Sequence, residues 1–315
     1  MSPRRRLRRG AIIGIAAAIL VLLAAGAALA LWLVGRGDSP EAVAQRYLDA
    51  LADGDGDAAR ATFADDAAPT TDTLDAFESA SAYLTRPEVA GAETSADDNT
   101  SVKASFFLAG GMHIVTFTVR QQDGRWVLGD DALGAITATT TLGDAVSVGG
   151  VMLETSASLK ALPAAYEVAA APGQILTGTA EAVVTPGGQT QVAVEASFAP
   201  DASNHAQSAV DAYLEACTRS SAGAPATTSP TACGIRIPWG ADLASADGFV
   251  FRVETLPTVA LDATGGFLAT GGSYVATVSG LTREGTPADY TYRDASWTLR
   301  GGLDFEGGEL VLRAW

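Results

Sequence analysis

The chain has 315 residues, of which 48% are hydrophobic, and it carries 36 Asp+Glu against 20 Lys+Arg, a formal charge of −16. The charge is segregated, because the first 37 residues hold six of the basic residues and none of the acidic ones. The remaining chain has 14 basic and 36 acidic residues and therefore a formal charge of −22. This composition indicates a globular protein of two or three domains, and such an acidic surface repels nucleic acid, which excludes nucleic-acid binding from the expected functions.

The first predicted element is an apolar run of 24 residues, 11–34, without a charged or strongly polar side chain. As a helix rising about 1.5 Å per residue, it is long enough to cross a hydrocarbon core of about 30 Å. Five arginines precede it within residues 4–9, and the positive-inside rule places such a cluster in the cytoplasm. We therefore expect a cytoplasmic basic tail over 1–10, a transmembrane helix over 11–34, and an extracytoplasmic chain beyond it.

The alternative for the same run is a cleaved signal peptide, whose apolar region is usually about 7–15 residues long. Ala28-Leu29-Ala30 resembles a cleavage site, but the apolar run continues from Leu31 to Val34, which favours an uncleaved anchor. No cysteine lies near the run, and this excludes a lipoprotein.

Residues 39–131 predict an α+β domain that begins with three helices. Ser39-Pro40-Glu41 supplies an N-cap, a first-turn proline and a first-turn acid, and apolar residues follow at helical spacing to about Ala52. Asp57 is expected to cap a second helix over 58–63. A third helix is expected to begin at Thr71 or Asp72 and to carry Leu74, Phe77, Tyr83 and Leu84, with Pro87 beyond its end.

Strands are predicted next, over 100–108, 112–120 and 125–128, with a turn at Asp123-Gly124. Helices followed by a curling antiparallel sheet indicate that the first domain ends near Asp131. From 137 to 200, short alternating runs at 145–148, 165–168, 180–184 and 191–196 are separated by Gly and Pro, a pattern typical of a small β-sandwich.

The third predicted domain, 204–315, contains an internal repeat of the first. Tyr213-Leu214-Glu215-Ala216-Cys217 repeats Tyr47-Leu48-Asp49-Ala50-Leu51 at an offset of 166 residues, and 293–299 repeats 122–128 at an offset of 171. A Ser/Thr/Ala/Pro loop, 220–230, replaces the second and third helices, so the copy is a degenerate α+β domain. Strands are expected over 249–253, 273–278, 290–300 and 309–313.

Two cysteines and three tryptophans carry further expectations for this fold. Cys217 and Cys233, an even pair on the exported side, predict a structural disulfide rather than a metal or redox site. Trp126 and Trp297, which occupy matching positions in the repeat, are expected to be core residues that close each sheet. Burial at a strand end is expected for Trp315.

The segments Ser39-Pro40-Glu41, Tyr47-Leu48-Asp49-Ala50-Leu51, Asp53-Gly54-Asp55 and Asp123-Gly124-Arg125-Trp126-Val127 together resemble the nuclear-transport-factor-2-like superfamily. The resemblance implies a cone of helices against a bent sheet for 39–131, and in degraded form for 204–315. Extracytoplasmic members of the superfamily include N-terminal domains of some penicillin-binding proteins and soluble parts of single-span subunits in conjugation and type IV secretion machines, whereas others are isomerases or dehydratases. The fold alone therefore does not choose a function.

No catalytic or metal motif is present in the sequence. Thr100 and Ala157 stand three residues before Lys103 and Lys160, the two lysines, so no Ser-x-x-Lys nucleophile exists, and Gly-x-Ser-x-Gly is absent as well. The acids Asp53, Asp55 and Asp57 begin like a calcium loop but lack its Gly and Glu, which favours a turn between helices. We expect no cofactor and no metal.

The resemblance leaves one catalytic possibility, because isomerases of this superfamily use a pocket Asp with Tyr and a protonated acid. The residues that could supply such a pocket are Asp65, Asp66, Asp75, Tyr83 and His113, although nothing in the sequence fixes their geometry. We expect instead a non-enzymatic binding or scaffold protein of the bacterial cell envelope, anchored in the membrane by one span and working with other envelope or secretion proteins. The alternative is a pocket in the first α+β domain that binds a small molecule or a lipid, or acts as an isomerase.

Overall fold

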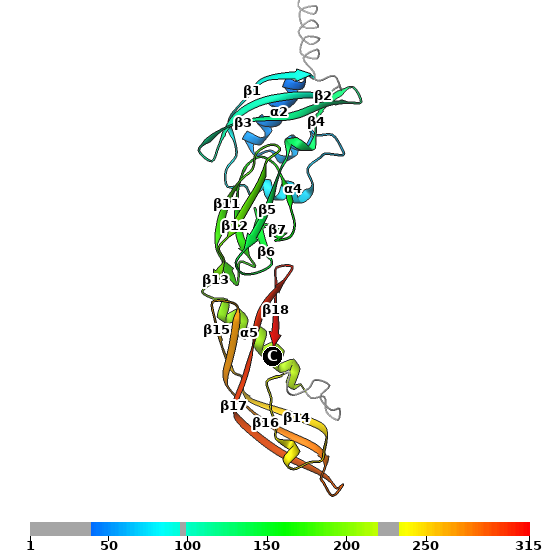
Figure 1. The fold of residues 1–315 in the computed structure, drawn as a ribbon, viewed down its shortest axis with the longest axis vertical. Coiled ribbons are helices and arrows are strands. Elements are labelled where there is room, and N and C mark those ends of the chain that lie inside the picture. The colour runs from blue at the N-terminus through cyan, green and yellow to red at the C-terminus, as the bar shows by residue number, and fades with distance from the viewer. Residues whose placement is uncertain (1–38, 95–98, 220–232) are drawn as a thin grey trace, which may run out of the picture. The chain divides into compact units, whose positions relative to one another are not determined.

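The computed structural model describes residues 39–94, 99–219 and 233–315, and its fold is strand-rich α+β with a curled sheet, as the sequence predicts (Figure 1). The predicted basic tail, the predicted transmembrane helix and the loop 220–230 lie outside these ranges. No helix within them is both long and apolar enough to cross a membrane. The chain divides into two compact units: one combines residues up to Pro69 with Leu84–Ala132, and the other combines Thr70–Tyr83 with Leu133–Trp315.

Two helices open the first unit. Helix α2 spans Pro40–Asp53; the amide of Ala42 donates to the Ser39 hydroxyl at 3.2 Å, which confirms the predicted cap, and the helix ends at Gly54 with a φ of 71°. Helix α3 spans Gly56–Arg60. Its cap is Asp55, which accepts a hydrogen bond from the Ala58 amide at 2.8 Å, so the prediction of a helix over 58–63 capped by Asp57 was wrong by two residues at the start.

The rest of the first unit is an antiparallel sheet in the order β1-β2-β3-β4, followed by the short helix η1, Asp130–Ala132. Its strands are β1 (Thr85–Thr94), β2 (Asn99–Leu108), β3 (Gly111–Gln122) and β4 (Arg125–Leu128). The sheet curls over α2, which contacts all four strands (Figure 1). The sequence analysis missed β1 because it contains Pro87. The structure places that proline at a register shift between Thr85 and Glu88, where a strand tolerates a residue without an amide hydrogen.

The second unit begins with helix α4, Thr71–Glu78, which Thr70 caps. Its Thr73 hydroxyl donates to the carbonyl of Lys160 at 2.8 Å, and the amide of Ser81 donates to the carbonyl of Ala165 at 2.8 Å. Tyr83 and Leu84 follow the helix rather than belonging to it, which corrects the predicted length of the third helix.

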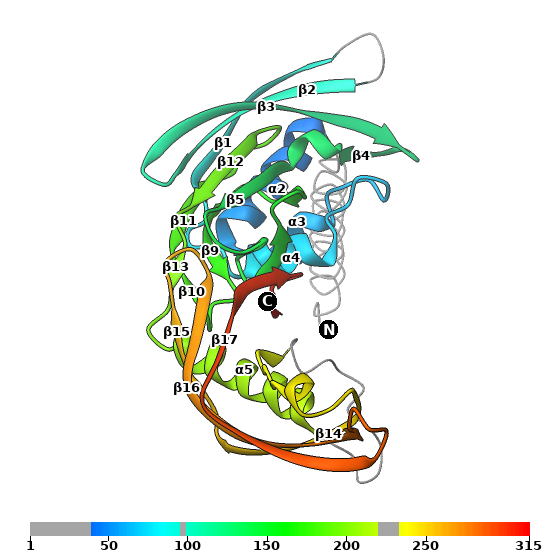
Figure 2. The ribbon, with the colours of Figure 1, turned by 60° about the horizontal axis from the view of Figure 1, so that its bottom comes forward.

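The middle of the chain forms two small sheets and one short strand pair (Figure 2). The sheet β11-β9-β6-β7 is antiparallel, whereas in β12-β5-β8 the pair β12–β5 is parallel. Buried aliphatic side chains from both sheets and the fully buried Tyr166 form the local core. The strands are β5 (Gly134–Thr140), β6 (Ala145–Val148), β7 (Val151–Glu154), β8 (Leu159–Ala161), β9 (Ala165–Ala171), β10 (Leu176–Thr177), β11 (Thr179–Val183), β12 (Gln189–Val194) and β13 (Ser197–Phe198).

The last part of the chain lays helix α5, Ala202–Thr218, on a long antiparallel sheet in the order β14-β16-β17-β18, with β15 also paired to β16. The strands are β14 (Ser245–Thr255), β15 (Thr258–Leu261), β16 (Gly266–Leu281), β17 (Pro287–Glu306) and β18 (Glu309–Ala314), and the short helix η3 spans Trp239–Ala241. The predicted disulfide between Cys217 and Cys233 is present, with Cα atoms 6.0 Å apart. The Trp297 indole donates to the Cys233 carbonyl at 2.9 Å.

One helix-to-strand clamp occurs twice in the molecule. In what we call the N-terminal module, α2 with β1–β4, the Gln45 amide donates to Asp49 at 2.8 Å and to the Pro87 carbonyl at 3.4 Å, and its oxygen accepts from the Val89 amide at 3.2 Å. In the C-terminal module, α5 with β14–β18, Gln207 makes the same three bonds to Asp211, Pro257 and Val259 at 2.7, 3.0 and 2.8 Å. Val89 pairs with Ala104 and Val259 with Ala269, so both modules continue the clamp in the same register.

The clamp corrects the repeat that the sequence predicts. It relates the helices at an offset of 162 residues, one helical turn away from the offset of 166 given by the sequence match. Tyr47 is fully buried, whereas Tyr213, which the sequence match pairs with it, is half-buried. Trp126 lies in the fourth strand and is half-buried, whereas Trp297 lies in the third strand of its sheet and is 1% exposed. Trp315, expected to be buried, is 73% exposed.

Candidate functional site

The space between α2 and the sheet of the N-terminal module is filled by aromatic side chains. The Tyr47 ring meets Phe63 and Phe117 edge-on at centroid distances of 5.4 and 5.9 Å. Its hydroxyl donates to the carbonyl of Ala132 at 2.7 Å, so the buried polar atom is satisfied. A packed, hydrogen-bonded Tyr47 occupies the interior in which a substrate pocket of this module would have to lie.

The residues that the sequence offers for such a pocket are divided between the two compact units. Asp65 and His113 belong to the first compact unit, and Asp75 and Tyr83 to the second. Both aspartates are exposed. The Tyr83 hydroxyl donates to the Phe77 carbonyl at 3.1 Å, while His113 lies 3.3 Å from the Leu108 carbonyl and stacks on Phe106. Each aromatic member is therefore committed to a local structural contact.

Two exposed carboxyl groups have lowered pKa values. The pKa of Asp66 is lowered by a hydrogen bond from the Arg120 side chain, and that of Asp262 by hydrogen bonds from Thr264 and Gly266. A general base at neutral pH usually needs a raised carboxyl pKa. Burial raises the pKa of Tyr274 to about 12, helped by the charge of Asp294, so this hydroxyl stays protonated.

An open cleft of about 520 Å³ lies between α2, α3 and β4. Small apolar side chains and Thr62 form much of its lining, and the half-buried Trp126 contributes an aromatic wall. Two of its carboxylates are already engaged, Asp49 by Gln45 and Asp55 by the α3 cap. The other charged residues of the lining are Arg46, Asp53 and Arg125. The cleft thus combines charges of both signs with one aromatic face, groups that can contact a polar ligand.

Two further grooves lie at matching places on the outer faces of the two modules. The groove of the N-terminal module, about 290 Å³, contains the cross-strand pair Lys103 and Thr116. The groove of the C-terminal module, about 490 Å³, contains the corresponding pair Leu268 and Arg300, together with Trp315. Ala104 and Ala269 are the residues that pair with the clamped Val89 and Val259. Lys103 and Leu268 directly precede these alanines, so the two groove pairs occupy the same register, and the outer groove is part of the repeated architecture.

A patch of three large apolar side chains, which we call the hairpin patch, lies at the β2–β3 hairpin of the N-terminal module. Phe107, Met112 and Ile114 are 38%, 63% and 61% exposed. Phe107 pairs directly with Met112, and Ile114 is the next residue on the same face. The guanidinium of Arg86 lies 5.5 Å from the centre of the Phe107 ring, a cation-π contact on the same surface.

Neither the cleft nor the hairpin patch is among the sites that the sequence predicts. The signal for the patch was present in residues 112–117, where Met112 and Ile114 on one face alternate with Val115 and Phe117 on the other. A strand that is apolar on both faces has either a second core or an exposed partner surface. The cleft had no such signal, because its lining comes from three elements far apart in the sequence.

Searches for related proteins and for a metal centre add no assignment. No family model, curated protein or solved structure matches the chain. Within 39–94, 99–219 and 233–315, no group of three or more His, Cys, Asp or Glu side chains is placed to hold a metal ion. The geometry of the described residues is therefore the basis for a functional proposal.

Proposed function

We propose that this chain is a non-enzymatic binding or scaffold protein, held in the bacterial cytoplasmic membrane by a span over 11–34, with its folded part on the extracytoplasmic side. The single observation that carries the binding role is the hairpin patch beside a filled interior. Large apolar side chains adjacent in register on one exposed face mark an interaction surface more often than a monomer's ordinary surface. Tyr47 meanwhile occupies the space that the alternative, an interior pocket, requires.

The membrane topology rests on the sequence, through the length of the apolar run and the arginine cluster before it. The finer fold assignment is also part of the proposal. A helix laid across a curled antiparallel meander supports a nuclear-transport-factor-2-like cone for the N-terminal module, and the shared clamp supports a degenerate second copy. The two small sheets between them support a β-sandwich.

Patch binding is tested in membranes by site-specific photo-crosslinking of the full-length chain. A photoreactive residue at Ile114 is expected to capture another envelope or secretion protein, identified by mass spectrometry. The matched control is Thr298, which takes the place of Ile114 on the third strand of the C-terminal module and is exposed but polar. Equal capture at both positions, or none at Ile114, would contradict a specific surface at the hairpin patch.

The anchor is tested separately, by alkaline extraction of membranes and by protease treatment of cells with the outer layers removed. The full-length chain should stay in the membrane pellet, and deletion of 1–34 should release it. Protease should reach the domains but not an epitope tag fused before Met1. Release of the full-length chain by alkaline extraction, or protection of the domains from protease, would overturn the proposed topology. This outcome is independent of the crosslinking result.

A further inference from the structure

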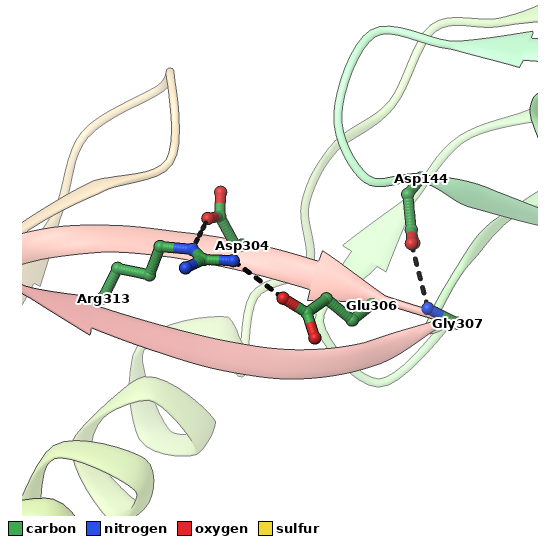
Figure 3. Close-up of polar contacts among 5 residues, drawn as sticks. All are labelled: Asp144, Asp304, Glu306, Gly307 and Arg313. Carbon is green, nitrogen blue, oxygen red and sulfur yellow. Dashed lines mark hydrogen bonds and ion pairs between the residues drawn. The ribbon is translucent and has the colours of Figure 1, made fainter.

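The tip of the last hairpin, β17–β18, is held by a carboxylate from the middle of the chain. Asp144 accepts hydrogen bonds from the amides of Gly307 at 2.9 Å and Gly308 at 3.4 Å (Figure 3). These partners are 163 and 164 residues apart in sequence. Both glycines have left-handed φ angles, 62° and 78°, and this turn presents its two successive amides to one acceptor. The contact is therefore a built anion cradle occupied by a side chain of the same protein.

Packing on both sides of Asp144 supports this hydrogen-bonded contact. The Met152 methyl group lies against Gly308 so closely that a Cβ at Gly308 would overlap it. Gly143, which precedes Asp144, has Phe305 of the hairpin on one side and Leu176 of the middle strands on the other, at 4.0 and 3.0 Å from where its Cβ would be. The hairpin tip thus fits a seat made by the loop before β6 and by β7.

The acidic residues near the seat require a counter-charge. Glu306 and Glu309 flank the two glycines, and Asp144 brings a further carboxylate to the same turn. Arg313 binds Glu306 at 2.7 Å and also binds Asp304, as Figure 3 shows. Since like charges repel, the guanidinium of Arg313 offsets part of the negative charge that Asp304 and Glu306 bring to the hairpin.

The seat lies far along the chain from the place where the middle strands pass into the C-terminal module. At that place the Ala199 amide donates to the Ile175 carbonyl at 2.8 Å, and the neighbouring Phe198 packs against the core of the C-terminal module. A single covalent connection leaves rotation free about a few backbone dihedrals, in the manner of a hinge. A second point of contact, far along the chain, removes that freedom.

We propose that Asp144 is a latch: its carboxylate holds the tip of the C-terminal hairpin on the middle strands, and its release turns 199–202 into a hinge about which the C-terminal module moves. The latch is suited to reversible use, because Asp144 is only half-buried and the hydrogen bonds are at the surface. The proposal concerns the second compact unit alone and does not depend on the membrane anchor or on the hairpin patch.

Hydrogen exchange of the full-length chain in detergent micelles tests the latch. In Asp144→Ala, exchange of the Gly307 and Gly308 amides should accelerate about tenfold or more, because a charge-assisted acceptor is lost. Asp144→Asn, which keeps one acceptor oxygen, should lie between wild type and Ala. Peptides from α5 and from β16 should keep their wild-type exchange, which separates release of the tip from unfolding. Unchanged exchange at the tip in Asp144→Ala would overturn the latch.

A matched glycine pair tests the seat from the other side. Gly308 and Gly285 have the same φ of 78°, but a Cβ at Gly285 would meet nothing within 4 Å. The Met152 methyl group is the end of a flexible side chain that is 49% exposed and can move aside, so Gly308→Ala should accelerate tip exchange modestly more than Gly285→Ala, and Met152→Ala should remove the difference. Equal effects of the two glycine variants would show that turn strain, not the seat, controls the tip.

The hinge is tested by the distance between spin labels at Glu154→Cys and Thr291→Cys, both at exposed positions of the second unit. Asp144→Ala should broaden the distance distribution of this pair. A control pair at Ser208→Cys and Thr291→Cys, within the C-terminal module, should stay narrow in both proteins. A broad distribution for the first pair already in the wild type, or no broadening in the variant, would overturn the hinge.

Discussion

The N-terminal and C-terminal modules share a clamp but fill the space beneath it in different ways. On the sheet of the N-terminal module Val102 faces Phe117 across two strands, whereas at the same register the C-terminal module places Phe267 opposite Gly301. The large side chain has changed strand, and a Cβ at Gly301 would overlap the Phe267 ring. One aromatic ring fills the pair in each module, and the C-terminal pair is the smaller because glycine stands where the N-terminal module has valine.

The neighbouring pair shows the same exchange. Phe106 stacks on His113 in the N-terminal module, and Gly272 faces Trp297 in the C-terminal module. A Cβ at Gly272 would lie 3.1 Å from the Trp297 ring, so the glycine makes room for the indole. His113 thus occupies a core-filling position, which agrees with its stacking and gives no support to a catalytic role. Letter-by-letter comparison fails here because the largest side chain of a cross-strand pair can lie on either strand.

Removal of the Trp297 side chain should give the largest difference in stability between the two modules. Trp297→Ala leaves a cavity and removes the hydrogen bond to the Cys233 carbonyl, and should cost about 3–5 kcal/mol of unfolding free energy in the C-terminal module. The sequence repeat aligns Trp126 with Trp297. Trp126→Ala should cost less than about 1 kcal/mol, because that side chain is half-buried at the cleft. Denaturant unfolding of both variants, followed by circular dichroism, measures the difference. Equal losses would restore the equivalence of the two tryptophans.

The disulfide should give the next largest effect and act on one module alone. Replacing Cys217 and Cys233 together by Ala frees a loop of 16 residues in the unfolded chain and should cost about 2–4 kcal/mol. Hydrogen exchange should accelerate in α5 and the β14–β18 sheet, while α2 and the β1–β4 sheet stay as protected as before. Loss of protection in the N-terminal module would contradict its independence.

The clamp itself should contribute similarly in both modules. Gln45→Met and Gln207→Met each leave a strand amide, that of Val89 or Val259, without its acceptor, and should cost about 1–2 kcal/mol. The effect at Gln207 should be the larger, because its bonds to Pro257 and Val259 are shorter, at 3.0 and 2.8 Å. Thermal unfolding of each variant, with Ser208→Ala as the exposed control, measures the order. A larger loss at Gln45 would refute the ranking.

The smallest contrast concerns two exposed carboxylates, Asp66 and Asp262. Both have pKa values below the ordinary 3.8, so each contributes stability that is present above the unfolded-state pKa and is lost as the pH falls through the folded-state value. Carboxyl titration by NMR should show Asp66 returning toward its ordinary pKa in Arg120→Gln, with Asp262 unchanged. Added salt should weaken the shift of Asp66 more, because its partner is a charge. If the pKa of Asp262 also rose in Arg120→Gln, the two lowered pKa values would not have separate causes.

Local signals in the sequence predicted the elements that depend on local chemistry. The α2 cap at Ser39, the strands 125–128 and 145–148 and the Cys217–Cys233 disulfide were confirmed, since each follows from residues that are close in sequence or unique in the chain. Strand β1 was missed because Pro87 argues against a strand unless a register shift removes the need for its amide. The exposure of Trp315 was not predicted because the neighbour of its ring, Gly302, is identified only once the strands are paired.

The candidate sites were less predictable than the fold. Asp65, Asp75, Tyr83 and His113 were selected by residue type, and their separation into two compact units depends on tertiary packing that residue type does not encode. The contact of Asp144 with the hairpin tip was also not predictable, since nothing in the sequence links that aspartate to a turn 163 residues later. The sequence match between the two modules lies one helical turn away from the register of the clamp, because only the Gln45 and Gln207 contacts fix that register.

The path of the chain through the two units also sets an order of assembly. Residues 70–83 leave the first unit to join the second, and their partners Ala165 and Lys160 lie 84 and 87 residues farther along, measured from Ser81 and Thr73. On a chain synthesised at about 5–20 residues per second, α4 waits roughly 4–17 s for the strands that cover it. The first unit can close its sheet during that interval. The apolar face of α4, with Phe77 and Ala76, is therefore the surface that a chaperone or a protease meets on the growing chain.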